Sequence, residues 1–133
     1  MFRLAPVSLL ILILWGCALF QAKETRYLKT AQDHATQEEV VEHLGRPLVA
    51  TVSPQGNAVW IYQIREQEPG NRWTSTGLWC DEYVLTFDGR SILRHWTHTS
   101  EFHGGELMPA YCVAGGASAS VAGRSRTRKL EGS

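Results

Sequence analysis

Three histidines and two glutamates lie close together in the second half of the chain: His95, His98, Glu101, His103 and Glu106. Imidazole nitrogens and carboxylate oxygens are zinc ligands, so the segment is a candidate metal or small-ligand site. On a β-strand, however, His95 and His98 would point to opposite faces, because successive side chains alternate. No Cys or HExxH spacing accompanies them. The pattern favours surface or hydrogen-bonded histidines and keeps ligand binding as an alternative.

Asp81 and Glu82 are the other candidates for chemistry. General acid–base catalysis by two carboxylates requires both groups in one cleft. Neighbouring positions on a strand face apart, so this pair does not predict an active site. We therefore expect no enzymatic activity, no catalytic residue, no bound metal and no cofactor.

The N-terminus has the features of a targeting segment. Arg3 precedes an apolar run over residues 4–14, which is the length of a signal-peptide core and short of the ~20 residues of a membrane span. The sequence Leu14-Trp15-Gly16-Cys17 then looks like a lipobox, with Cys17 as the lipid-anchor residue. Trp15 stands where a small residue is usual, and the alternative is an uncleaved membrane anchor. Either prediction places the remaining chain outside the cytoplasm.

With Cys17 lipidated, Cys80 and Cys112 remain as an even pair. In an oxidising compartment two such thiols tend to form a disulfide, which would stabilise the fold by ~3–4 kcal/mol. The alternative is two separate buried thiols. A catalytic cysteine is less expected, because no base adjoins either residue in the sequence.

The elements that position these residues begin with a short helix over residues 36–44. Thr36 and Glu39 have the spacing of a capping box, and Gly45 followed by Pro47 is a typical helix end. The apolar side chains form one narrow stripe: Val40, Val41 and Leu44. Such a stripe needs a partner surface.

Alternating patterns predict strands after this helix and a helix before it. Residues 23–35 are compatible with a first short helix, and the β-prone residues 48–53 form a hairpin with a strand over 58–66. Two more strands are predicted over 78–87 and 91–97. Counting 58–66, 78–87 and 91–97 as its strands, the expected fold is α+β, with two short helices packed on a three-stranded antiparallel sheet.

Five tryptophans in 133 residues are enough for an aromatic core or for an adhesive surface. Trp73, Trp79 and Trp96 are the candidates for binding, since tryptophan is enriched at interface hot spots. Their alternative place is the core or a covered sheet face.

Several motifs in order resemble the SmpA/OmlA (BamE-like) lipoproteins. They follow the lipobox and lie within residues 27–96: Thr36-x-x-Glu39-Val40, Leu44-Gly45-x-Pro47, Trp60-x-Tyr62 and Val84-Leu85-x-Phe87-Asp88-Gly89. The resemblance implies two helices on a three-stranded sheet and a lipid anchor in the outer membrane, facing the periplasm. It also implies a role in outer-membrane protein assembly beside the barrel-assembly machinery. The chain departs from the family at Cys80 and Cys112, over residues 73–82, and after Trp96.

Together these patterns divide the chain into a signal peptide (1–16), a lipidated tether (17–26), an α+β domain (27–113) and a disordered basic tail (114–133). Residues 17–117 hold 8 Lys/Arg and 12 Asp/Glu, whereas residues 118–133 hold 4 and 1. An acidic body argues against nucleic-acid binding. The predicted function is a lipid-anchored scaffold that binds another envelope protein. A ligand-binding lipoprotein and an inhibitor-like module are the alternatives.

Overall fold

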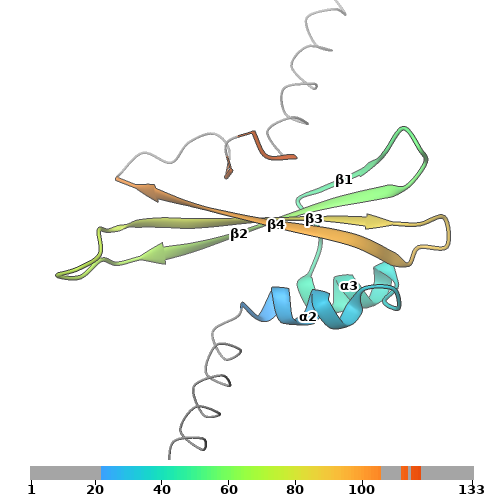
Figure 1. Ribbon diagram of the computed structural model, residues 1–133, viewed down its shortest axis with the longest axis horizontal. Coiled ribbons are helices and arrows are strands. Elements are labelled where there is room, and N and C mark those ends of the chain that lie inside the picture. The colour runs from blue at the N-terminus through green and yellow to red at the C-terminus, as the bar shows by residue number, and fades with distance from the viewer. Residues whose placement is uncertain (1–21, 106–111, 114, 118–133) are drawn as a thin grey trace, which may run out of the picture. The chain divides into compact units, whose positions relative to one another are not determined.

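A computed structural model describes residues 22–105, 112, 113 and 115–117 of this chain. Its helices and strands, shown in Figure 1, are α2 (Lys23–Ala31), α3 (Gln37–Leu44), β1 (Val49–Val52), β2 (Ala58–Glu68), β3 (Gly77–Phe87) and β4 (Leu93–Gly104). The strands form one antiparallel sheet in the order β1-β2-β3-β4. The α+β class and the antiparallel sheet are confirmed. Among the described residues, no helix is long and apolar enough to cross a membrane.

The predicted number of strands was wrong, because the sheet has four strands and not three. The fourth is β1, which pairs with β2 from Val49 opposite Ile61 to Val52 opposite Ala58. It is the first arm of the predicted hairpin, but three of its four residues are exposed. This segment is a strand because its backbone pairs with β2, and it buries no hydrophobic face. Its sequence therefore lacks a clear alternation of apolar and polar residues.

The helix α2 ends at Ala31, four residues before the predicted end. Asp33 adopts the left-handed conformation with φ 69°, which a continuing helix does not allow. By its contacts the chain divides at this point into two units, of which the structure describes residues 22–30 in the first and residues 31–105, 112, 113 and 115–117 in the second. Within the first unit, Leu28 is fully buried and Thr30 donates a hydrogen bond to the Tyr27 carbonyl.

The predicted capping box of α3 is confirmed. The Thr36 backbone N–H donates to the Glu39 carboxylate at 2.7 Å, and the Glu39 N–H donates to the Thr36 hydroxyl at 3.3 Å. Gly45 ends the helix at φ 79°. Its carbonyl accepts a hydrogen bond from the Tyr62 hydroxyl on β2 at 3.0 Å, so the helix end is fixed to the sheet.

The segment before α3 lies against the start of β4. The backbone N–H groups of Asp33 and Gln37 donate to the carbonyls of Leu93 and Ser91, and Leu93 N–H donates to the Ala35 carbonyl. These three bonds hold the entry of α3 beside β4, which the sequence pattern did not predict.

The turn between β3 and β4 is organised by Asp88. Its carboxylate accepts from the Arg94 guanidinium at 2.8 Å and from the backbone N–H groups of Ile92 and Arg90. The hydrogen bond from Arg94, followed by that from Ile92, lowers the pKa of Asp88 from 3.8 to about 2. The same pairing, with Asp33 as the second partner of the guanidinium, raises the pKa of Arg94.

The two faces of the sheet follow from the register. Trp60 and Tyr62 lie on the same face of β2, as predicted. Their partners on β3 are Leu85 and Tyr83, respectively. The buried side chains of this face are Tyr62, Tyr83, Leu85, Phe87 and Leu93. Full burial of Leu85, Phe87 and Leu93 stabilises the fold by about 1.5–3 kcal/mol for each side chain.

The opposite face carries Cys80 and Glu82. Cys80 forms the predicted disulfide with Cys112, with their Cα atoms 5.4 Å apart, and both residues are fully buried together with Val113. Glu82 is only 3% exposed and accepts a hydrogen bond from the Ala117 N–H at 2.8 Å. Residues 112, 113 and 115–117 are therefore fixed to this face of the sheet.

Candidate interaction surface

Two exposed aromatic side chains face each other across β3 and β4. Trp79 and Phe102 are paired in the ladder, their ring centroids are 5.1 Å apart, and the rings are tilted by 51°. They remain 42% and 37% exposed. Large aromatic groups that stay in contact with each other and with water form an apolar surface suited to a binding partner. We call Trp79 and Phe102 the aromatic pair.

The position of the aromatic pair follows from the length of the strands. The register places Trp79 opposite Glu66 on β2, so the aromatic pair lies on the face of Trp60 and Tyr62. Figure 1 shows α3 at the end of the sheet with the β3–β4 turn, while the strands reach beyond it toward the β2–β3 turn. Trp79 therefore occupies a core-type position on a part of the sheet that α3 does not cover.

A polar pair lies between the aromatic pair and the core. His98 Nε2 is 2.6 Å from Asp81 Oδ1, and the imidazole is stacked on the Tyr83 ring at 4.3 Å with an angle of 8° between their planes. Tyr83 is buried, so the imidazole has a rigid support. The carboxylate and the ring together fix the orientation of His98 at the surface.

Trp73 is the most exposed of the three tryptophans proposed for binding, with 88% of its surface accessible. It lies in the β2–β3 loop, where the Asn71 side chain accepts hydrogen bonds from the N–H groups of Trp73 and Thr74. Arg72 lies over the indole at 5.9 Å. The loop thus holds Trp73 in an ordered turn and presents it to solvent.

The third tryptophan proposed for binding, Trp96, is not part of the aromatic pair. Trp96 is half-buried on β4 opposite Leu85. Phe102 was not predicted, because the strand was expected to end at residue 97. Continuing its alternation through His98 and Ser100 would have placed Phe102 beside Trp79.

The three histidines do not come together. The register puts His95 and His103 on the face opposite to His98, as expected for an ordinary strand. His103 is hydrogen-bonded to the Cys112 carbonyl at 2.6 Å, and Glu106 lies outside the described residues. Within residues 22–105, 112–113 and 115–117, no three His, Cys, Asp or Glu side chains are grouped to hold a metal ion.

Asp81 and Glu82 also lie on opposite faces, as their adjacency predicts. Asp81 pairs with His98, whereas Glu82 binds the Ala117 backbone. These two carboxylates therefore cannot act together on one bound molecule. The predicted lipid-anchor residue, Cys17, lies outside the described residues, and so do positions 114 and 118–133 of the predicted tail (114–133).

Comparison with known proteins gives no assignment: no protein-family model, no curated protein and no solved structure matches the chain. The resemblance to BamE-like lipoproteins rests on the sequence motifs alone.

Proposed function

We propose that the chain is a non-enzymatic, lipid-anchored interaction protein of the bacterial envelope, which binds another envelope protein through the aromatic pair. The contact between two exposed aromatic side chains, Trp79 and Phe102, on the sheet face that also carries the buried Tyr83 and Leu85 is the observation that carries this proposal. Tryptophan is enriched among the few interface residues that carry most of the binding energy, each of which costs about 2 kcal/mol or more on truncation.

Three further features support the location of this interaction. The disulfide between Cys80 and Cys112 is typical of proteins that fold in an oxidising compartment. The lipobox ending at Cys17 predicts a lipid anchor, and the BamE-like motifs imply the periplasmic side of the outer membrane. On this resemblance, the barrel-assembly machinery is the first partner to test.

Membrane fractionation and affinity purification test the proposal directly. The native chain and a Cys17→Ser variant are expressed with a C-terminal tag, and co-purified proteins are identified by mass spectrometry. We expect the native chain in the outer membrane with an envelope protein, and the variant in the soluble fraction. Recovery of the native chain without any partner would contradict the proposed function.

The surface itself is tested by Trp79→Ser, with Leu48→Ser as the matched control. Leu48 is also apolar and 61% exposed, but it lies beside β1 and away from the aromatic pair. Trp79→Ser is expected to reduce partner recovery at least tenfold, since 1.4 kcal/mol corresponds to a factor of ten in affinity. Equal recovery with both variants, with unchanged circular dichroism spectra, would exclude the aromatic pair as the binding surface.

The exposed, ordered position of Trp73 favours a second candidate, an inhibitor-like module that inserts this residue into the cleft of a periplasmic enzyme. In that case Trp73→Ser would abolish partner recovery and Trp79→Ser would not. The same purification, repeated with both variants, separates the two functions.

A further inference from the structure

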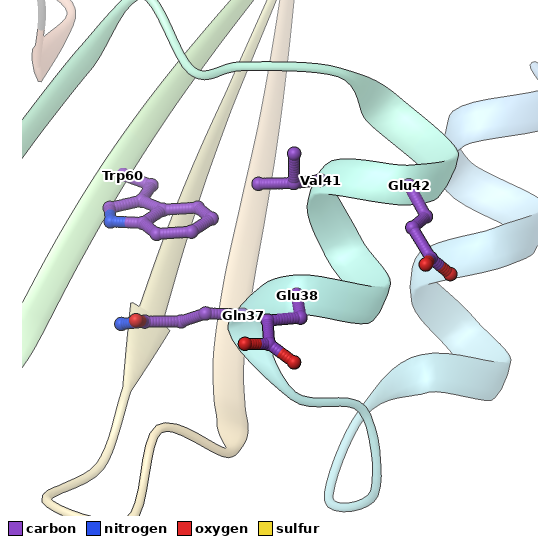
Figure 2. A pocket seen from close by; sticks show the side chains of 5 residues that line it. All are labelled: Gln37, Glu38, Val41, Glu42 and Trp60. Atoms are coloured by element: carbon purple, nitrogen blue, oxygen red, sulfur yellow. The ribbon is translucent and has the colours of Figure 1, made fainter.

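A groove lies between α3 and β2, at the covered end of the sheet. It has a volume of about 440 Å³ and is lined by Gln37, Glu38, Val41, Glu42 and Trp60. Figure 2 shows the Trp60 ring opposite Val41, with the Gln37 side chain extending past the ring. Glu38 projects from α3 near Gln37, whereas Glu42 lies on the other side of Val41 from Trp60 and points away from the ring. The groove therefore has an apolar floor and an acidic rim.

The floor is held rigidly. The Trp60 ring packs against the buried Phe87 ring at 4.7 Å with a tilt of 56°. Trp60 itself is only half-buried, so part of its ring remains open toward the groove. An indole that packs against the core on one side and is accessible on the other can bind a cation over its face or an aliphatic chain along it.

The helix dipole favours the negative charge of Glu38, in the first turn of α3, but it does not explain Glu42. Glu39 serves the capping box, but Glu38 and Glu42 have no hydrogen-bond or ion-pair partner within the described part of the chain. They stand four positions apart, where like charges on a helix repel each other. Glu42 also lies near the C-terminal end of α3, where the helix dipole disfavours a negative charge. A cation bound at the rim would relieve both effects.

We propose that this groove binds an extended basic segment of the partner protein, with arginine or lysine at alternate positions. Residues four apart on a helix are about 6 Å apart along its axis, and alternate residues of an extended chain are about 6.6 Å apart. Two alternate cations thus match Glu38 and Glu42, and the stem of one packs over Trp60. This inference deepens the proposed interaction role and rests on it for the identity of the natural partner.

The peptide acetyl-Arg-Ser-Arg-Thr-Arg-amide is a suitable probe, because its arginines have the alternate spacing. It is titrated into the ¹⁵N-labelled full chain in mild detergent and followed by two-dimensional NMR. We expect saturable shifts of the Trp60 indole N–H and of the Gln37 and Val41 amides. The peptide acetyl-Gln-Ser-Gln-Thr-Gln-amide, which has no charge, should cause none.

Charge-removing variants locate the binding. Glu38→Gln and Glu42→Gln should each weaken peptide binding about two- to fivefold, as expected for a partly exposed ion pair. Glu66→Gln removes the same charge from an exposed position on β2 outside the groove and should leave binding unchanged. An absence of saturable shifts, or equal weakening by all three variants, would overturn the proposal.

The chain's own basic residues are an alternative occupant. Arg124, Arg126 and Arg128 also have the alternate spacing. If replacing these three by glutamine shifts the Trp60 and Val41 signals without any added peptide, the groove is occupied by the chain itself and the partner proposal fails. Failure of the peptide titration while partner recovery remains sensitive to Trp79→Ser would reject the groove and retain the proposed function.

Discussion

Reduction of the Cys80–Cys112 disulfide is expected to lower the free energy of unfolding by about 3.7 kcal/mol. The two cysteines are separated by 32 positions. In the chain-entropy model, a closed loop of this length removes about 12 cal/mol/K of entropy from the unfolded chain, which gives this value at 25 °C. Both residues are fully buried with Val113, so loss of their packing adds to the effect.

Urea unfolding measures this difference. The full chain with Cys17→Ser keeps a single pair of thiols, and unfolding is followed by tryptophan fluorescence with and without reductant. With a slope of about 1.2 kcal/mol/M, which is usual for a domain of this size, the midpoint should fall by about 3 M.

The double variant Cys80→Ala/Cys112→Ala is the matched control. It should unfold near the midpoint of the reduced chain and should not respond to reductant. A shift of less than about 0.5 M between the oxidised and reduced chains would refute the stabilising role assigned to this bridge, since it would amount to well under 1 kcal/mol.

Two further predictions concern the helix cap and the β3–β4 turn. Thr36→Ala should destabilise the fold by about 1 kcal/mol in urea unfolding, whereas Thr36→Asn, which can still cap, should be nearly neutral; equal losses would exclude the cap as the cause. Because the folded pKa of Asp88 is about 2 and its ordinary value is 3.8, its contribution is complete above pH 3.8 and is lost as the pH falls toward 2. Asp88→Asn should remove this part of the acid dependence, which unfolding curves below pH 5 would show; an unchanged dependence would contradict the pairing with Arg94.

Local features of the fold were predictable because their signals are local. The Thr36/Glu39 capping box and the glycine at position 45 depend only on neighbouring residues, and the structure confirms them. The disulfide could be expected from cysteine parity combined with the predicted compartment. By contrast, the position of the segment before α3 depends on the backbone bonds that Asp33 and Ala35 make with Leu93, about 60 residues away.

The binding surface was only partly predictable for the same reason. Tryptophan count and strand alternation identified Trp79, but its exposure depends on where α3 ends relative to the sheet. The aromatic pair also depends on the length of β4, because the continuation of this strand to Gly104 brings Phe102 into contact with Trp79. The groove beside Trp60 arises from two segments that are distant in sequence, so no spacing in either one predicts it.

The sequential pairing of the strands has a consequence for the order of folding events. Every strand neighbour in the sheet is also the next strand along the chain, so each pairing closes only a short loop. Such topologies form rapidly, because little loop entropy is lost before contacts form, whereas thiol oxidation takes seconds to hours. We therefore expect β3 and β4 to be paired before Cys112 reaches Cys80, so that oxidation locks a sheet that is already in register.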